Sequence, residues 1–531
     1  MTNSQQTSAP VQLTVEKKNS SPETIACDLL VVACDPRGLE DVCKFTDNEK
    51  AVFDSLINYT FHTTVVKVPV PTDPDSMPEY GIILKPEAID KMSGAVSGYR
   101  NETAKQFSLQ TANAMTENLV TVYQIQGPCK TPWTNEQFLQ NLKDTLSDLD
   151  WWPYDSFEIC TDTNGKAVAL STPYFDHFNN DNLIAKMPWN YLGVQGTGNT
   201  IYVHGSTCFE SVLQCWQFGE LLLKNQSSLG YELPSNMDAT IIILGAGPSG
   251  MLFAHRLQGL GYTNVQILES TDRFGGKTHT VTFQEPAPPG PNQSTPCELG
   301  TCYMSPAYDD MADELKDFMK DNPRHGFFLK SDHKPPKDPA HSSFRGMVTE
   351  DQFTGVPMQE TTIGYSDYVT LKGFYEANQP FADPNNWLAN YSSKEVGVEI
   401  GIALAAYWAY VEEFFGTSLP MPTTPPQALL DEGYTSFYDM LKKQDLLVLT
   451  GLLEYSYSVQ GYGPLKNIPA YYGMIWISKP LVEAILESSL GITNKPTVTV
   501  LYKGWLNIWD QMEPTLNVTL NAKVTNIERI I

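Results

Sequence analysis

Basic residues, paired cysteines and a long uninterrupted apolar segment are scarce or missing in this 531-residue chain. Its 35 Lys and Arg residues are outnumbered by 61 Asp and Glu residues, which gives a formal net charge of −26. A surface this acidic repels phosphate backbones, so we expect no nucleic-acid partner. The nine cysteines include no CxxC pair and accompany no histidine cluster. Neither a metal site nor a disulfide scaffold is therefore expected.

The chain also shows no signal peptide, because its start, MTNSQQTSAP, has neither a basic nor an apolar region. Its longest apolar segment is 396–415. Glu399, Glu412 and Glu413 interrupt this segment, and the uncharged run is too short to cross a bilayer. The segment predicts a buried helix in a soluble protein without a membrane span. Cellular location and oligomeric state stay open.

The strongest local signal lies in residues 239–269. A β-branched run at 240–244 predicts a buried strand, and a helical pattern and a second strand, 265–268, follow it. The turn between the first strand and the helix has the dinucleotide-binding spacing; its residues are Gly245, Ala246, Gly247, Pro248, Ser249 and Gly250. Such a turn lets a diphosphate meet the N–H groups of the helix N-terminus. Glu269, which ends the second strand, suits a ribose hydroxyl pair and disfavours a 2′-phosphate.

A second glycine pair follows in the sequence Arg273-Phe-Gly275-Gly276-Lys277. Together with Glu269, this segment resembles the motif of the flavin-containing amine oxidase superfamily: an acid, four residues ending in Arg, then x-Gly-Gly-Arg. Lys277 replaces the last Arg, which keeps the charge but loses bidentate geometry. Residues 298–300, which end at Gly300, resemble the family's strand beside the flavin. The resemblance implies FAD as cofactor, in an α/β fold with a Rossmann-type domain (a parallel sheet plus a β-meander) and a second α+β substrate domain.

The order of the segments differs from the family's order, in which the glycine unit lies near the N-terminus. Here 238 residues precede it, and they resemble the family's second half. Residues 28–33 resemble a strand that returns to the FAD domain. Residues 199–205 and 206–223 resemble the final flavin-binding strand and helix, with the closest likeness to a branch that contains polyunsaturated fatty acid isomerases. This likeness implies that Gly205, Glu210 and Val212 contact the flavin, and that Val524, in the strand pair 516–531, holds the adenine.

A circularly permuted chain explains this order. The FAD-binding domain is then built from 1–39, 186–223, 238–302 and 496–531, the substrate domain from 40–185 and 303–495, and 224–237 is a linker. A cut at an exposed turn loses few contacts, and native termini often lie close together. Two alternatives stay open: a mis-joined product of tandem gene copies, and two chains that exchange halves.

Catalytic candidates are fewer. The resemblance places Lys67 where the family often has a lysine that holds a water beside the flavin; the alternative is a strand lysine facing solvent. The aromatic residue that the family's final helix contributes beside the flavin falls at Ser211, which places simple amine oxidation in doubt. Tyr471, Tyr472 and Trp476 are candidates for the wall of a larger, more apolar pocket, or for core packing.

Three functions remain. The first is hydride abstraction from a C–N or C–H bond of a small or lipid-like substrate, with dioxygen as oxidant. The second is redox-neutral isomerisation of double bonds in polyunsaturated fatty acids. The third is a flavin-fold protein without catalysis.

Overall fold

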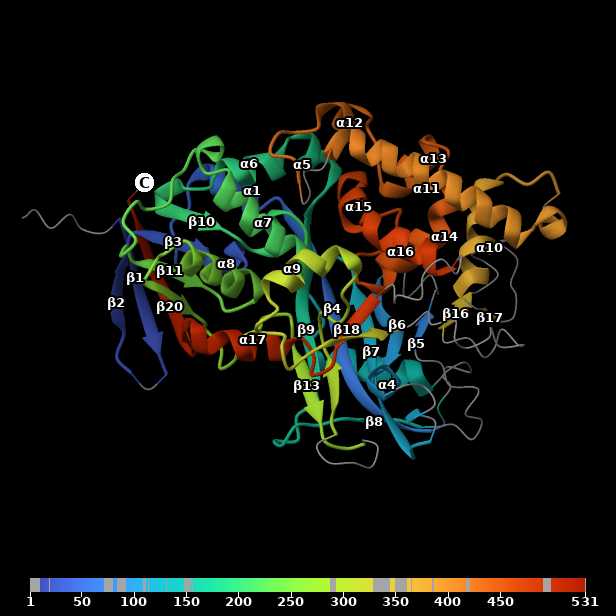
Figure 1. Ribbon diagram of the computed structural model, residues 1–531, viewed down its shortest axis with the longest axis horizontal. Helices are drawn as coiled ribbons and strands as arrows, with labels where there is room; N and C mark the ends of the chain where they lie inside the picture. The colour runs from blue at the N-terminus through green and yellow to red at the C-terminus, as the bar shows by residue number, and fades with distance from the viewer. Residues whose placement is uncertain are drawn as a thin grey trace, which may run out of the picture.

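The computed structural model contains a parallel sheet and a larger mixed sheet (Figure 1). It describes residues 10–18, 20–70, 80–83, 92–107, 111–112, 114–129, 131–147, 154, 156–286, 293–327, 344–348, 361–363, 365–383, 386–416, 421–489 and 498–530.

A five-stranded parallel sheet forms the left part of the molecule in Figure 1. Its strands, in spatial order, are β10 (Thr200–Tyr202), β3 (Leu29–Val32), β11 (Ile241–Leu244), β12 (Val265–Leu268) and β19 (Asn517–Thr519). Because β3 and β11 are buried on both faces, they consist of aliphatic residues throughout. The parallel sheet of a Rossmann-type fold is thereby confirmed.

Two crossover helices serve this sheet. α7 (Val212–Lys224) connects β10 to β11, and α8 (Pro248–Gly259) connects β11 to β12. The two helices pack against each other. The predicted helix over 206–223 is therefore present, but it begins six residues later. Residues 205–207 form a short 3-10 turn, and the hydroxyl of Ser211 caps the helix by accepting from Gln214 N–H at 3.2 Å.

Both ends of the chain meet in a three-stranded antiparallel sheet. Its strands are β2 (Glu23–Cys27), β1 (Val11–Lys17) and β20 (Ala522–Arg529), with β1 in the middle. The last pairing continues beyond the strands, since Ile530 N–H donates to the carbonyl of Pro10 at 3.1 Å. The first and last described segments, which begin at Pro10 and end at Ile530, therefore lie side by side at the left of the view (Figure 1).

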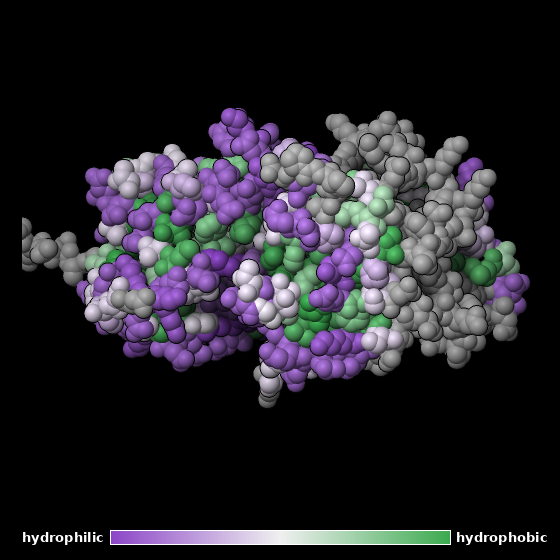
Figure 2. Space-filling model, turned by 90° about the horizontal axis from the view of Figure 1, so that it is seen from below, coloured by the Kyte–Doolittle hydropathy of each residue, from purple (hydrophilic) through white to green (hydrophobic). Residues whose placement is uncertain are grey.

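The right part of the molecule contains an eight-stranded sheet. Its strands in order are β17 (Thr361–Ile363), β16 (Phe344–Val348), β5 (Tyr80–Ile83), β6 (Ser93–Asn101), β7 (Glu117–Gln126), β4 (Leu56–Pro69) and β8 (Glu158–Ile159), and β9 (Ala169–Phe178) pairs with β4 as well. Two further antiparallel pairs, β13 (Thr280–Phe283) with β14 (Thr295–Glu298) and β15 (Arg324–Phe327) with β18 (Val498–Leu501), form two-stranded sheets of their own. Seen from below, apolar residues gather towards the middle of the molecule, and hydrophilic residues dominate the left part (Figure 2).

The helices beyond α7 and α8 are α1 (Asp47–Phe53), α2 (Glu102–Phe107), α4 (Asn135–Ser147), α5 (Asn180–Ile184), α6 (Met187–Gly193), α9 (Asp309–Glu314), α10 (Tyr365–Ala377), α11 (Ser393–Phe415), α12 (Gln427–Asp431), α13 (Phe437–Lys443), α14 (Thr450–Val459), α15 (Ala470–Trp476), α16 (Lys479–Ser489) and α17 (Leu506–Met512). Of these, α10 to α16 lie in the upper right part of Figure 1, whereas α4 and α17 lie in its lower half.

α11 corrects one prediction. The helix is present, but it is buried on one side only, and Val398 and Ile402 are 60% and 67% exposed. The middle of the helix lacks charge because small and aliphatic residues occupy both its outer face and its inner face. Within the described ranges, no helix combines the length and apolarity that crossing a membrane requires.

Candidate functional site

The backbone of the loop between β11 and α8 requires glycine at both ends of the loop. Gly245 has φ of +105°, a conformation that favours glycine. A Cβ at Gly250 would lie 2.1 Å from the carbonyl oxygen of Gly245, so the first turn of α8 packs directly on the loop. These two glycines fix the shape of the turn.

Gly247 is different, because the protein itself leaves room for a side chain there. Its φ is −77°, which any residue adopts, and a Cβ would meet only the Cα of Gly276, at an ordinary 3.8 Å. Gly247 immediately precedes α8, whose first-turn N–H groups have no acceptor within the helix. Open space beside unpaired N–H groups fits a diphosphate, which requires close backbone approach.

The second glycine pair lies against the first loop. Gly275 N–H donates to the carbonyl of Ala246 at 2.8 Å, and a Cβ at Gly276 would lie 3.0 Å from the Cα of Gly247. The Arg273 guanidinium donates to the carbonyl of Gly276 at 2.8 Å, and burial lowers its pKa. The structure thus brings the two predicted glycine segments together.

Glu269 holds the loop from the end of β12. One carboxylate oxygen accepts from Ala246 N–H at 2.9 Å, and the other accepts from Thr271 N–H at 2.8 Å. The second oxygen also accepts from the Thr271 hydroxyl at 2.8 Å, so the first oxygen is the one that can accept a further hydrogen bond. A ribose could therefore bind Glu269 without displacing either contact.

Gly300 follows β14 and touches the second glycine segment. A Cβ there would lie 1.8 Å from the carbonyl oxygen of Lys277, so only glycine fits between the two backbones. Val524 lies on β20 opposite Val15, beside an irregularity in the pairing of β1 with β20.

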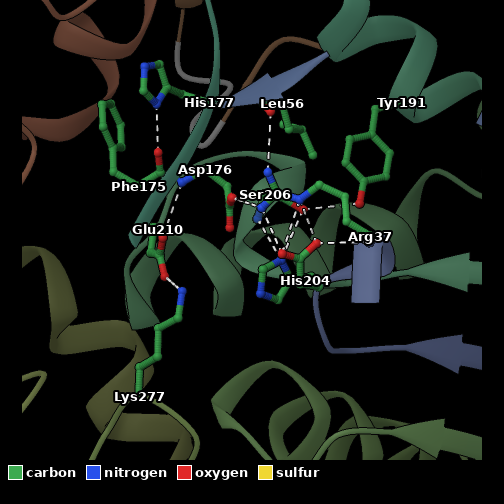
Figure 3. Close-up of polar contacts among 11 residues, drawn as sticks. Arg37, Leu56, Phe175, Asp176, His177, Tyr191, His204, Ser206, Glu210 and Lys277 are labelled. Carbon is green, nitrogen blue, oxygen red and sulfur yellow. Dashed lines mark hydrogen bonds and ion pairs between the residues drawn. The ribbon is translucent and has the colours of Figure 1, made fainter. Parts of the chain in front are cut away.

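A group of charged side chains lies at the carboxyl ends of β3 and β10 (Figure 3). The Arg37 guanidinium donates to Asp35 at 2.7 Å and also forms an ion pair with Asp176 of β9. Burial alone would raise the pKa of Asp35, but the hydrogen bonds from Arg37 hold it below its ordinary value. The second oxygen of Asp176 is buried and has no hydrogen-bond partner in the described part of the chain.

His204 and Ser206 extend this group. Their side chains lie 3.0 Å apart, and the Tyr191 hydroxyl lies 3.2 Å from that of Ser206. Burial lowers the pKa of His204, so the imidazole is neutral near pH 7.

Glu210 and Lys277 connect this group to the glycine loops (Figure 3). The two form an ion pair, and the other oxygen of Glu210 accepts from Asp176 N–H at 3.3 Å. Burial alone would lower the pKa of Lys277, but Glu210 and Asp176 raise it, so the lysine stays charged. Its side chain is 32% accessible, so the ion pair is not closed off from its surroundings.

Aromatic rings cluster beside Glu210, whose backbone carbonyl accepts from the Tyr462 hydroxyl at 3.1 Å. Phe209 stacks on Trp476 with ring centroids 5.5 Å apart, and Tyr462 lies 4.9 Å from Phe209 and 4.7 Å from Trp476. Tyr471 and Tyr472 are 2% exposed, whereas Trp476 is only half-buried. Of the three predicted pocket aromatics, Trp476 is the one with surface to offer a ligand.

Lys67 is not brought to the glycine loops. It lies near the end of β4 and is half-buried, with its ammonium 3.7 Å from Glu117 and 3.8 Å from Glu158. Thr63, four residues earlier on the same face of β4, donates to the carbonyl of Leu299 at 2.8 Å. At about 3.3 Å per residue, Lys67 lies roughly 13 Å further along the strand.

Sequence reasoning missed Asp35, Arg37 and Asp176. Asp35 and Arg37 directly follow a strand that was predicted, and residues beyond the carboxyl ends of parallel strands line ligand sites in such folds. That rule could have found them. No local signal marks Asp176, which lies 139 residues from Arg37 along the chain.

No group of three or more His, Cys, Asp or Glu residues within the described ranges could hold a metal ion. Residues 243–321 match the family model of an NAD(P)-binding Rossmann-like domain.

Three curated proteins are similar over short segments. A flavin-dependent L-tryptophan oxidase of Lentzea aerocolonigenes is 49% identical over 45 residues, 8% of this chain and 9% of that protein. A polyenoic fatty acid isomerase of Ptilota filicina is 37% identical over 76 residues, 14% and 13% of the two chains. A putrescine oxidase of Kocuria rosea is 27% identical over 197 residues, 34% and 37%. The chain thus spans between about a tenth and just over a third of the length of these relatives.

Two solved structures were also matched. A fatty acid isomerase from P. acnes that produces CLA has 17% identity and a TM-score of 0.31, covering 54% of this chain and 52% of that one. A triple mutant of putrescine oxidase has 18% identity and a TM-score of 0.32, covering 54% and 51%. The Rossmann-like match over residues 243–321 and the similarity to flavin-dependent oxidases and a fatty acid isomerase support a relationship of this chain to the amine oxidase-like flavoproteins.

Proposed function

We propose that this chain binds FAD at the loop that opens at Gly245 and is an FAD-dependent oxidoreductase. The observation that carries the proposal is Gly247, where the missing side chain faces open space beside the N-terminus of α8. In this proposal the N–H groups of Ser249 and Gly250 bind the diphosphate, and Glu269 accepts from the adenosine ribose. The remaining cofactor contacts are proposed for Pro248, Arg273, Gly275, Gly276, Lys277, Gly300, Val524, Gly205, Glu210 and Val212.

The proposed reaction removes hydride from a C–N or C–H bond of a small or lipid-like substrate. Bound FAD would supply the redox chemistry, and dioxygen is the proposed oxidant. The protein's part is to orient the substrate and to exclude water from the site beside the ion pair of Lys277 and Glu210. Lys67 as the lysine that holds a water remains a proposal, and its distance along β4 from Thr63 counts against it.

The charge of the site favours a C–N substrate. Three carboxylates, Asp35, Asp176 and Glu210, stand against two cations, Arg37 and Lys277, and His204 is neutral. One carboxylate is in excess, and the unpartnered oxygen of Asp176 could accept from an ammonium group. A protonated amine would balance this charge, whereas a fatty acid carboxylate would add to it.

The second candidate is double-bond isomerisation of polyunsaturated fatty acids. The aromatic group of Phe209, Tyr462 and Trp476 supports it, because Trp476 is half-buried and could face an apolar chain. The similarity to the Ptilota filicina isomerase points the same way.

A purified chain tests these candidates together. We expect a yellow protein with flavin absorbance that amines or amino acids bleach under anaerobic conditions, with peroxide formed in air. Conjugated-diene absorbance from polyunsaturated fatty acids without peroxide would favour the isomerase instead. Colourless protein that does not take up FAD, or bound FAD that no substrate bleaches, would favour a flavin-fold protein without catalysis.

We also propose that the segment order is a circular permutation in one compact chain. The pairing of β1 with β20 and the presence of β3 and β19 in one sheet support it. The domains proposed are those defined by the resemblance, with 224–237 as the joining segment.

A further inference from the structure

Strand β14 is held by side chains of the eight-stranded sheet and of α2. Lys105 donates to the carbonyl of Pro296 at 3.1 Å, and Arg100 donates to that of Glu298 at 2.9 Å. Thr63 donates to the next carbonyl, that of Leu299, at 2.8 Å. Three donors thus hold the segment that leads to Gly300.

Glu102 holds the two cations in place. Its carboxylate accepts from Arg100 at 2.7 Å and forms an ion pair with Lys105 at 2.5 Å. It also accepts from Glu298 N–H at 3.3 Å, so it contacts β14 directly. Burial alone would raise the pKa of Glu102, but Arg100 and Lys105 lower it to about 2.

All three charges are fully buried, with side-chain exposures of 3% for Arg100, 0% for Glu102 and 1% for Lys105. Buried ion pairs contribute little net stability compared with apolar residues of similar volume. Stability alone is therefore a weak reason for this arrangement, and its geometry suggests a positional role.

A series of close contacts connects β14 to the glycine loops. Gly300 packs on the carbonyl of Lys277 with no room for a Cβ. Lys277 directly follows Gly276, which packs on Gly247. Because each step is a close backbone approach, a displacement of β14 would be transmitted to the loop at the N-terminus of α8.

We propose that Arg100, Glu102 and Lys105 are positioning residues for the cofactor site. They hold β14 so that Gly300 keeps the second glycine segment against Gly247. This inference rests on the proposed FAD site, and it assigns the cluster a role in cofactor affinity rather than in folding.

The test is the dissociation constant of FAD for the flavin-stripped full-length chain, measured by quenching of flavin fluorescence. We expect Lys105→Met to raise it by at least about tenfold, the ratio that loss of one hydrogen bond from a charged donor produces. The visible circular dichroism of bound flavin should change as well. Lys105→Arg should recover most of the affinity because it keeps the charge and donors.

Lys224→Met is the matched control. Lys224 is 71% exposed and pairs only with Glu220 on the same helix, so its loss should leave FAD affinity unchanged. Thermal unfolding without FAD shows whether each variant is folded. If Lys105→Met does not fold, Glu102→Gln, which keeps the shape of the side chain, takes its place with the same expected loss of affinity.

Two results would overturn the inference. One is an unchanged dissociation constant in folded Lys105→Met. The other is unfolding of both Lys105→Met and Glu102→Gln without FAD, which would assign the cluster to fold stability. Failure of the parent chain to bind FAD would instead refute the proposed function on which the inference rests.

Discussion

Gly250 and Gly247 lie at the same loop, but a side chain at each position would contact different neighbours. Gly250 meets the carbonyl of Gly245, whereas Gly247 meets almost nothing of the protein. We therefore predict that Gly250→Ala lowers the free energy of unfolding by about 3 kcal/mol through overpacking. Gly247→Ala should change it by less than about 1 kcal/mol and raise the FAD dissociation constant by at least about tenfold. Chemical denaturation and FAD titration measure the two effects. Equal loss of stability in both variants would contradict the assignment of open space to Gly247.

At the scale of elements, a buried ion pair joins the last strand to the first helix. Arg529 of β20 donates to Glu49 of α1 at 2.7 and 2.9 Å, and the Tyr202 hydroxyl donates to the same carboxylate. Removing one partner leaves a buried charge, so Arg529→Met should destabilise the fold by about 3–5 kcal/mol. Thermal unfolding of the variant beside the exposed control Lys523→Met tests this expectation. A loss no larger than that of the control would contradict it.

The same pair predicts a pH dependence. Burial alone would raise the pKa of Glu49, but hydrogen bonds from Arg529 and Tyr202 hold it below its ordinary value. A lowered folded-state pKa contributes stability above the unfolded-state pKa, about 4.3, and this contribution disappears as pH falls through the folded-state value. The stability difference between the parent and Glu49→Gln should therefore shrink as pH drops below about 4. A difference that stays constant down to acid unfolding would refute this origin.

Local signals decided which elements the sequence could predict. The unit from β11 to β12 could be predicted because its strand, glycine turn and helix follow one another within about 30 residues of the sequence. The start of α7 was missed although Ser211 and Gln214 have the spacing of an N-cap. Lys67 shows a second limit of prediction. The composition predicts strand β4, but it does not predict that Thr63, and not Lys67, contacts the segment that follows β14. The contact between Arg37 and Asp176 could not be predicted, because the two residues are 139 positions apart and no local pattern encodes such a contact.

At the scale of the molecule, the first and last described residues are adjacent, since Ile530 N–H donates a hydrogen bond to the carbonyl of Pro10. We predict that a chain that begins at Asn236, joins residue 531 to residue 1 through a short Gly-Ser linker and ends at Ser235 folds as the parent does. The new cut falls in an exposed turn, so few contacts are lost. Its melting temperature should lie within about 5 °C of the parent's, with the same flavin spectrum. A monomer–dimer change on relinking would favour chains that exchange halves instead.

The proposed site places a dinucleotide at the loop between β11 and α8. A crystal structure of the protein with FAD tests it most directly. We expect diphosphate oxygens within hydrogen-bond distance of the Ser249 and Gly250 N–H groups, and the adenosine ribose on Glu269. FAD bound elsewhere, or a loop that side chains close in the complex, would contradict it.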